Sequence, residues 1–382
     1  MRKFLILTLI SLFALTPSAS QPIESRLAAL FDARYPDATA PGAAMIVAKG
    51  NQILFERYRG VADYGTGAII EPATRFNIAS ISKQFTAAAA MLLQERRMID
   101  LNNHIIHYYP QLRADVMREV TFRHLLSHSS GIPDARPRSD RHWVLTATDE
   151  ESIDYLPDVT ELHFRPGTAY EYINPTFQIF YDLIQRLSGS SFTDFMAKNV
   201  FEPAGMTDSQ YFDAGIDMPS ASHAYIPATS AQVTGSDSRG GKWQEFDYGE
   251  ETFFATKADG GLYCTARDLL SWNLALRDAR VISHISYEAM CEPITEVSGS
   301  TFSSYQNRPN TFYGLGLFID TTPGRPVKIY HTGDNGGYQA YLAYYPACDI
   351  SIIVLENRND LDRWSFATAI DEALAQASLL SR

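Results

Sequence analysis

The two ends of this chain carry strand-like patterns, whereas helical spacing and loops dominate its middle. Near the N-terminus, apolar runs on both sides of a Lys-Gly-Asn turn at 49–51 predict a β-hairpin over residues 42–62. Apolar, β-rich segments separated by Pro and Gly turns follow Thr311, and a helical pattern over 362–379 closes the chain. We therefore predict an α/β (α+β) fold, with one antiparallel sheet built from both chain ends, flanked by helices, plus a mostly helical part.

The segments between these ends carry mostly helical spacing. Helices are expected over 22–35, over the alanine-rich stretch after Ser80, and over 174–189, where apolar residues share one face and Gly189 ends the pattern. A further helix begins at Thr265, whose spacing to the next acidic residue is that of a capping box. These patterns place helices on the sheet and in a separate helical part.

The expected division of the chain follows from the same patterns. After a leader at 1–20, one domain spans 21–382, with its α/β part at about 21–80 and 311–382 and its helical part at about 81–310.

The leader has the three parts of a secretory signal peptide. Cations at Arg2 and Lys3 precede an apolar core over 4–15 and small residues at 18–20. The core is too short to span a bilayer, and no later stretch reaches the roughly 18 apolar residues that a membrane span needs. We therefore expect an exported protein, periplasmic or secreted after cleavage, with no stable membrane span.

Composition excludes some classes of protein. Of the 382 residues 45% are apolar and 20% charged, which argues against a disordered chain, and the formal net charge of −12 without a basic run argues against a nucleic-acid partner. The three cysteines are widely spaced and odd in number, which favours buried free thiols. One disulfide bond between two of them is the alternative. Residues 208–255, rich in Ser, Gly, Asp and Thr, are expected to form long surface loops.

The first candidate for chemistry is the sequence SISK, from Ser80 to Lys83. Residues three apart on a helix point about 60° apart, whereas neighbours differ by about 100°, so Ser80 shares a face with Lys83 and Ser82 points away. Backbone N–H groups at a helix N-terminus would suit an acyl oxyanion. The plain alternative is that Ser80 only caps the helix and Lys83 is solvated.

Two further motifs could complete such a site. Tyr172 and Asn174 follow a Pro-Gly turn and precede a helix, and a tyrosine beside a lysine can activate a hydroxyl without histidine. The sequence His331-Thr332-Gly333 ends an apolar strand, where glycine permits close approach of a ligand or of another backbone. Taken alone, each motif is also explained by a turn tyrosine that packs on the core or by a strand-end histidine.

The three motifs in this order resemble the serine β-lactamase-related superfamily, which includes class C β-lactamases, D-Ala-D-Ala carboxypeptidases, D-aminopeptidases and esterases. The segments TFRHLLSHSSGIPD, FRPGTAYEYINP and ADGGLYCTARDLLSW are also similar to that family, and the resemblance spans roughly 25–380. It implies a β-lactamase/transpeptidase-like fold and an exported serine hydrolase that acts on small peptides, amides or esters, with D-amino-acid peptides or β-lactams among the candidates.

The resemblance also implies residue roles. Ser80 would be the acylated nucleophile, Lys83 would take up or relay its proton, and Tyr172 would be the base in acylation and help activate water in deacylation. Asn174 would hold Lys83 and touch the substrate, and the backbone N–H groups of Ser80 and Asp334 would form the oxyanion hole. Whether Tyr172 or Lys83 is the formal base stays open, because coupled groups share their titration.

The third motif departs from the β-lactamase pattern. His331 stands where β-lactamases usually carry lysine, and with Thr332 and Gly333 it is expected to bind substrate. Histidine at this position is similar to the carboxypeptidase, aminopeptidase and esterase members, which weakens β-lactamase activity as the main role. Because histidine titrates near pH ~6.5, recognition of a substrate carboxylate is expected to depend on pH.

Other functions are less well supported. His124 and His128 lie four apart, as in zinc-binding helices, but the glutamate of that motif and a spaced third ligand are missing, so no metal and no cofactor are expected. The alternative function is a catalytically weak penicillin-binding-type sensor or scaffold on the same fold. Loss of Lys83 or Tyr172 would signal it, and both are present. The sequence leaves the oligomeric state unknown.

Overall fold

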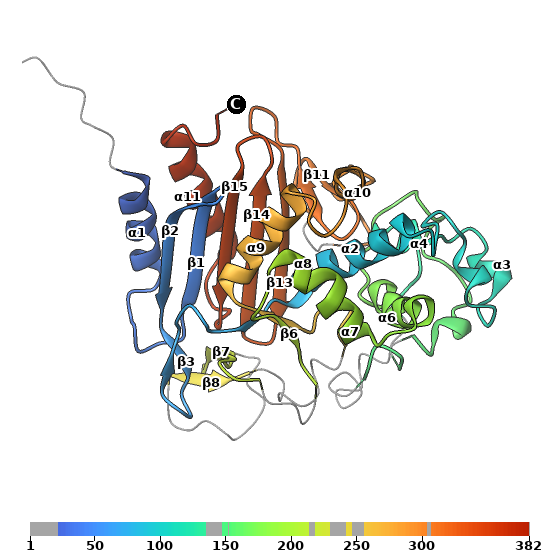
Figure 1. Cartoon of the computed structure of the whole chain (residues 1–382), viewed down its shortest axis with the longest axis horizontal. Coiled ribbons are helices and arrows are strands. Elements are labelled where there is room, and N and C mark those ends of the chain that lie inside the picture. Colours follow the sequence, from blue (N-terminus) through green and yellow to red (C-terminus); the bar gives the residue numbers. More distant parts are fainter. Residues whose placement is uncertain are drawn as a thin grey trace, which may run out of the picture.

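The computed structural model describes residues 22–134, 147–151, 153–213, 218–229, 242–246, 256–303 and 307–381, so the expected signal peptide lies outside the described residues. An eight-stranded antiparallel sheet forms the centre, in the order β10-β11-β12-β13-β14-β15-β1-β2 (Figure 1). Its strands are β1 (Ala43–Lys49), β2 (Gln52–Arg59), β10 (Thr295–Glu296), β11 (Thr311–Tyr313), β12 (Phe318–Asp320), β13 (Lys328–Asn335), β14 (Tyr338–Tyr345) and β15 (Ile350–Glu356).

The sheet joins the two ends of the chain, as the sequence predicts. Strand β1 pairs along its whole length with β15, so the N-terminal hairpin β1–β2 extends the C-terminal strands β13 to β15. Gly50, at the tip of that hairpin, has φ +53°, which glycine adopts without the steric cost of a Cβ. The predicted fold class is confirmed.

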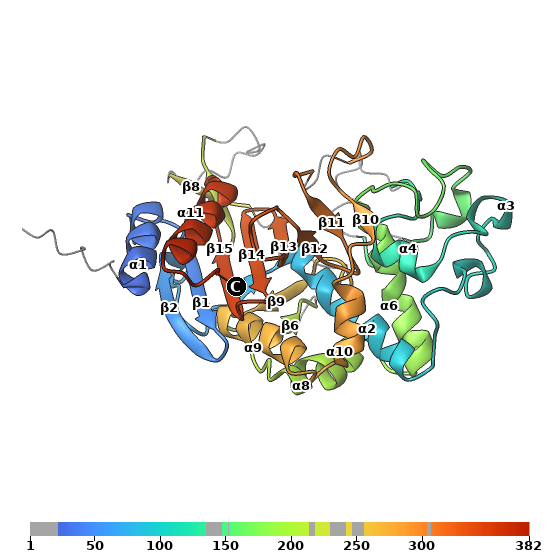
Figure 2. The same ribbon diagram turned by 90° about the horizontal axis from the view of Figure 1, so that it is seen from above.

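Alternate residues of β1 belong to two separate cores on the two faces of the sheet. Ala43, Met45 and Val47 pack in the cluster of α1 (Ile23–Arg34) and α11 (Arg363–Gln376), whereas the intervening residues pack in the cluster of α2 (Ser82–Glu95) and α9 (Ala266–Arg277). Figure 2 shows α1 and α11 on one side of the sheet and α9 on the other. This period of two is what a sheet buried on both faces requires.

Helix α2 also forms the border of the helical part, which lies beyond one end of the sheet (Figure 1). It packs against α6 (Pro175–Ser188), which begins with a proline and ends at Gly189 in the left-handed conformation, as predicted. The other helices are α3 (Ala114–Met117), α4 (Phe122–Leu126), α7 (Phe192–Met196), α8 (Glu202–Ala204), α10 (His284–Met290) and the short turns η1 (Ala79–Ile81), η2 (Ile105–His107), η3 (Leu156–Asp158) and η4 (Ala197–Phe201).

The expected boundary between the two parts stays a prediction. Helix α9 and strand β10, both inside 81–310, belong to the sheet layer, since α9 packs on β1 and β15 and β10 pairs with β11. The smaller strands are β3 (Val61–Asp63), β4 (Ala68–Ile69), β5 (Phe76–Asn77), β6 (Gln210–Tyr211), β7 (Tyr225–Pro227), β8 (Trp243–Glu245) and β9 (Leu262–Cys264).

The prediction of long surface loops over 208–255 is wrong for part of this region. Its described residues include β6, β7 and β8, and Tyr211, Tyr225 and Ile226 are buried. Short strands form here although apolar residues are few and scattered, because pairing stabilises them: β6 pairs with β9, and β7 pairs with β8.

Two other expectations concern the membrane and the cysteines. Among the described residues, none of the helices combines the length and the apolar character that crossing a membrane requires. All three cysteines are free thiols, with Cys264 and Cys348 buried as expected and Cys291 half-buried.

Candidate active site

Ser80 is presented by a strained turn rather than by a regular helix start. It lies in η1, directly before α2, and the preceding Ala79 has φ +47°, a left-handed conformation that costs a residue with a Cβ about 1 kcal/mol or more. Asn77 accepts the Ala79 N–H at 2.9 Å, and Asn335 of β13 donates to the same Asn77 oxygen at 3.0 Å. The sheet therefore holds the turn that carries Ser80.

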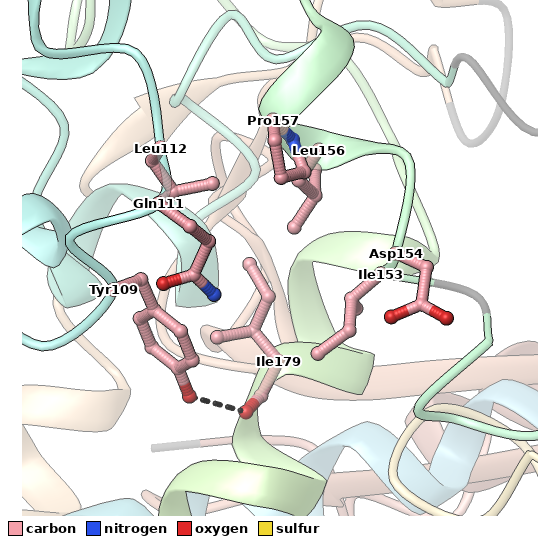
Figure 3. Close-up of a pocket in the computed structure, with 8 residues that line it drawn as sticks. All are labelled: Tyr109, Gln111, Leu112, Ile153, Asp154, Leu156, Pro157 and Ile179. Atoms are coloured by element: carbon pink, nitrogen blue, oxygen red, sulfur yellow. Dashed lines mark hydrogen bonds between the residues drawn. The ribbon is translucent and has the colours of Figure 1, made fainter.

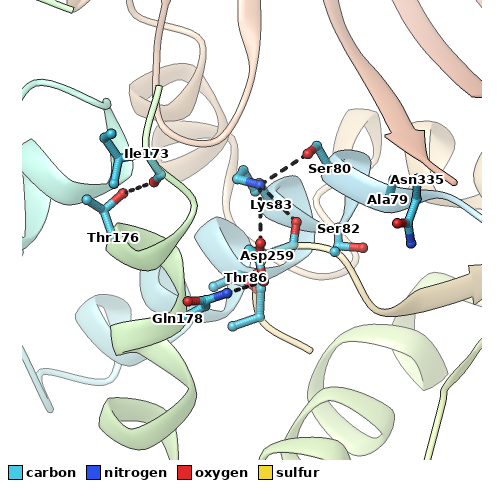
Figure 4. A network of polar contacts seen from close by, with 12 residues as sticks. Ala79, Ser80, Ser82, Lys83, Thr86, Ile173, Thr176, Gln178, Asp259 and Asn335 are labelled. Carbon is cyan, nitrogen blue, oxygen red and sulfur yellow. Dashed lines mark hydrogen bonds and ion pairs between the residues drawn. The ribbon is translucent and has the colours of Figure 1, made fainter. Parts of the chain in front are cut away.

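The predicted pairing of Ser80 with Lys83 is present. Lys83 Nζ donates to Ser80 Oγ at 3.2 Å, and Ser80 is half-buried, so its hydroxyl is within reach of a substrate (Figure 4). Ser82 points elsewhere, as predicted: it is fully buried and accepts a hydrogen bond from Leu262 N at 3.3 Å. The geometry thus separates a reachable serine beside a lysine from a structural one.

The Lys83 side chain is 0% exposed and is surrounded by polar and aromatic groups. Its Nζ donates to the backbone oxygen of Asp259 at 2.9 Å and lies 4.0 Å from the Asp259 carboxylate (Figure 4). The rings of Tyr172 and Phe177 have their centroids 5.0 and 5.6 Å from Nζ. These contacts hold the Lys83 amino group in place beside Ser80.

Tyr172 is brought to the same site by His128. The His128 ring lies 4.2 Å from the Tyr172 ring, and the backbone on both sides of Tyr172 is bonded to His128: Glu171 N to its carbonyl oxygen at 3.0 Å and Ile173 N to its Nδ1 at 3.3 Å. Because Nδ1 accepts, the imidazole is neutral, and burial together with the charge of Lys83 lowers its pKa well below the usual value. His128 fixes the tyrosine loop.

Strand β13 contributes a backbone edge close to Ser80. Strand β12 pairs only as far as Tyr330, so among the described residues no strand pairs with the segment from His331 onward on that side, and this segment packs against η1. A Cβ on Gly333 would lie 2.1 Å from the Ile78 carbonyl oxygen, so only glycine permits this approach. The predicted reason for the glycine in the third motif agrees with this contact.

The expectation that His331 titrates near neutral pH is wrong. Its ring is fully buried, Nδ1 must donate to the Thr332 carbonyl oxygen at 2.7 Å, and Nε2 therefore accepts from the Tyr313 hydroxyl at 3.1 Å. Burial and the nearby charge of Lys83 lower the His331 pKa to about 3. At neutral pH His331 carries no charge with which to bind a carboxylate.

The remaining predicted residues lie at the border of the site. Strand alternation places Thr332 and Asp334 on the face opposite Gly333, and the exposed Asp334 carboxylate pairs with Arg363 of α11 at 2.9 Å. Asn174 precedes α6 and is half-buried; its side-chain oxygen has no hydrogen-bond partner among the described residues. Its expected contact with Lys83 or a substrate amide stays a prediction.

Two residues of the site were not predicted. Asp259 is 5% exposed and touches Lys83, and the only signal for it was an acidic residue before a double glycine in an otherwise apolar segment. For His128, the sequence shows only the spacing of a zinc-binding helix without its other ligands. Its role depends on φ +52° and on contacts with a segment more than forty residues away, which no local pattern reveals.

Other features of the molecule lie apart from these residues. In the described part of the chain, no group of three or more His, Cys, Asp or Glu side chains is placed to hold a metal ion. A cavity of about 130 Å³ lies in the helical part, between Tyr109, Leu156 and Ile179 (Figure 3). None of the predicted site residues lines it.

Comparison with known proteins agrees with this geometry. The beta-lactamase family model matches residues 27–376. Penicillin-binding protein 4* of Bacillus subtilis is 24% identical over 83% of this chain and 68% of its own length, and the D-aminopeptidase of Gluconobacter oxydans is 25% identical over 94% of this chain. This chain spans only 63% of the latter's length, and 57% and 52% of two D-aminopeptidases from Cereibacter sphaeroides and Brucella anthropi.

A solved structure supports the fold. The D-amino acid amidase from Ochrobactrum anthropi SV3, in complex with L-phenylalanine amide, superimposes with a TM-score of 0.73 at 19% identity, covering 93% of this chain and 99% of the amidase. Together with the family match over most of the chain, this makes the assignment plain: the chain belongs to the beta-lactamase family of serine hydrolases.

Proposed function

We propose that this protein hydrolyses small peptides, amides or esters through an acyl-enzyme on Ser80. The observation that carries the proposal is the 3.2 Å contact between the half-buried Ser80 hydroxyl and the fully buried Lys83 amino group, next to Tyr172. A hydroxyl held in this way can attack a carbonyl carbon once its proton has a place to go.

The proposed reaction has two halves. In the first, Ser80 Oγ bonds to the carbonyl carbon while its proton passes to the Tyr172–Lys83 pair and then to the departing amine or alcohol. The backbone N–H groups of Ser80 and Asp334 would stabilise the oxyanion, because Gly333 lets β13 lie against η1. In the second half, water activated by Tyr172 attacks the acyl ester and releases the acid and free Ser80.

Derivatives of D-amino acids are the substrate class to test first. D-aminopeptidases match most of this chain, and the similar solved structure is that of a D-amino acid amidase. Neutral His331 removes a charge that would bind the carboxylate of a penicillin or a peptide C-terminus, which favours uncharged amides and esters over β-lactams. We also propose export to the periplasm or outside the cell, on the basis of the N-terminal leader pattern.

Hydrolysis of D- and L-amino-acid amides, esters, D-Ala-D-Ala peptides and a penicillin tests this proposal. We expect product release by the wild-type protein, with amides and esters ahead of the penicillin, and none by Ser80→Ala. No hydrolysis of any of these by the wild type, or equal hydrolysis by both proteins, would contradict it.

A further inference from the structure

Asp259 contacts Lys83 with both its backbone and its side chain. The backbone oxygen accepts from Nζ at 2.9 Å, and carboxylate Oδ2 lies 4.0 Å from the same atom. We propose that Asp259 is a positioning residue which keeps Lys83 in the ammonium form and aimed at Ser80. The inference rests on the proposed function for the role of Ser80. It adds Asp259 to the site and assigns a positive charge to Lys83.

The carboxylate is held in place by α6 and is not a mobile surface group. Asp259 is 5% exposed, and Gln178 of α6 donates to its Oδ1 at 3.0 Å (Figure 4). A buried carboxylate is tolerated when it is hydrogen-bonded and paired with a cation, and Gln178 and Lys83 supply these two contacts.

The backbone before Asp259 is fixed as well. Asp149 accepts the N–H groups of Lys257 and Ala258 at 2.6 and 3.0 Å, and Thr86 of α2 donates to the Ala258 oxygen at 2.6 Å. These three bonds tie the segment to α2 on one side and to the helical part on the other. The backbone that carries Asp259 is therefore held in one position relative to Lys83.

Three further titratable groups of the described residues lie near Lys83, each on a different segment. Tyr172 lies before α6, His128 follows α4, and His331 is on β13. Burial and the charge of Lys83 lower the pKa of both histidines, to about 3 for His331, so both are neutral at physiological pH. Asp149 faces Asp259, and burial followed by the charge of Asp259 raises its pKa.

The groups around Lys83 determine whether its side chain is a neutral amine or an ammonium. Complete burial favours the neutral amine, and a neighbouring cation would do the same, but both histidines are uncharged. The Asp259 carboxylate acts in the opposite direction, and an opposite charge within about 4–6 Å typically moves a pKa by one to three units towards the charged form. The geometry thus favours an ammonium.

An ammonium has no lone pair, so its role differs from that of a base. Lys83 would donate a hydrogen bond to Ser80 Oγ and stabilise a phenolate on Tyr172, which would take the Ser80 proton and pass it to the leaving group. Of the two candidate bases that the sequence leaves open, Tyr172 is then the base. Lys83 orients the Ser80 hydroxyl and supplies the positive charge that stabilises the phenolate.

Titration of Lys83 by NMR measures its charge state without any substrate. The chain has seven lysines, so selective ¹³Cε labelling gives few signals, and Lys83→Met identifies the one from Lys83. In the full chain we expect Lys83 to titrate at or above the free-lysine value of about 10.4, and in Asp259→Asn at least about one pH unit lower. Asp213→Asn, which removes an equal charge from the partner of Lys257, should leave the midpoint unchanged.

A pH profile of kcat/KM is the second readout. With Lys83 required as ammonium, Asp259→Asn should move the alkaline limb to lower pH by the same amount, whereas a lysine that acts as a neutral base would instead gain activity on the acid side. An unchanged Lys83 midpoint in Asp259→Asn, or a gain on the acid side, overturns the inference.

The wild-type titration alone also decides the matter if Asp259→Asn does not fold. A Lys83 midpoint below about 9 means that the lysine is depressed by burial and that Asp259 does not hold its charge, which overturns the inference. A protein that hydrolyses none of the substrates but shows the expected titrations would refute the proposed function and leave the role of Asp259 supported.

Discussion

The segment from Ser80 to Lys83 and the segment from His331 to Asp334 lie next to each other, yet they contribute to the site in different ways. In the first, two side chains face one another at 3.2 Å. In the second, the side chains take part in the fold: His331 bonds to Thr332 and Tyr313, and Asp334 pairs with Arg363. Strand β13 contributes backbone groups close to Ser80, because Gly333 lets the strand pack against η1.

The comparison shows that a residue of a sequence motif can contribute through packing and hydrogen bonds rather than through charge. A histidine at a strand end suggests a pH-sensitive binding group when only the sequence is considered. Once the ring is buried beside a lysine, the same residue is neutral and holds the strand, so the site depends on Lys83 and Asp259 for its charges. Substitutions in the two segments should therefore have different kinds of effect.

The largest effect is expected for the first segment. Ser80→Ala should abolish turnover, because it removes the hydroxyl that Lys83 Nζ contacts at 3.2 Å. Ser82→Ala should keep most of the turnover but lose about 1–3 kcal/mol of stability, since Leu262 N–H would lose its buried acceptor. Steady-state rates and urea unfolding of both variants check this, and equal losses of rate would refute the separation of the two serines.

Tyr172→Phe should lower kcat by at least about 100-fold, the range of a lost general base. Its free energy of unfolding should change little. The ring of the variant can keep its contact with His128, which lies 4.2 Å away, so the loop should remain in place. A rate close to that of the wild type would remove Tyr172 from the reaction.

Gly333→Ala tests whether β13 acts through its backbone. The added methyl would lie 2.1 Å from the Ile78 oxygen and force η1 and β13 apart, and misplacing Ser80 by about 1 Å can cost up to about 100-fold in rate. Gly260→Ala is the matched control, because there an added Cβ meets nothing within 4 Å. If Gly333→Ala keeps as much activity as Gly260→Ala, the contact of β13 with η1 is unimportant.

The smallest effect on rate is expected for His331→Gln, which acts instead on stability. With a folded pKa of about 3 and an unfolded value near 6.5, only the unfolded chain takes up a proton between these values, so the His331 contribution is complete above pH ~6.5 and lost as the pH falls towards 3. The stability difference between wild type and His331→Gln should shrink by up to about 1.4 kcal/mol per pH unit below pH 6. Urea unfolding at pH 7, 6 and 5 measures it, and a difference that grows at low pH would contradict the neutral ring.

Local patterns in the sequence were sufficient for the sheet, for the helices with clear caps and for the Ser80–Lys83 face. Residues such as Gly189 and Thr265 act on their immediate neighbours, so their effects can be predicted from spacing alone. That strands from both chain ends share one sheet was also predictable, whereas the pairing of β1 with β15 in particular was not.

Features that depend on contacts between distant segments could not be predicted. The pKa of His331 depends on burial by Tyr313 and on the position of Lys83, and the contact of Asp259 with Lys83 joins residues 176 positions apart. The buried strand at Tyr225 was missed for the same reason, since Asn357 accounts for its backbone hydrogen bond. Charge states and burial of this kind follow from the assembled fold.

The central claim, that Ser80 is an activated nucleophile, is tested most directly by intact mass after exposure to a fluorophosphonate probe. The wild-type protein should gain the mass of one adduct, Ser82→Ala should gain it as well, and Ser80→Ala should gain none. An adduct on Ser80→Ala, or none on a wild-type protein whose site admits the smallest probe, would contradict the account.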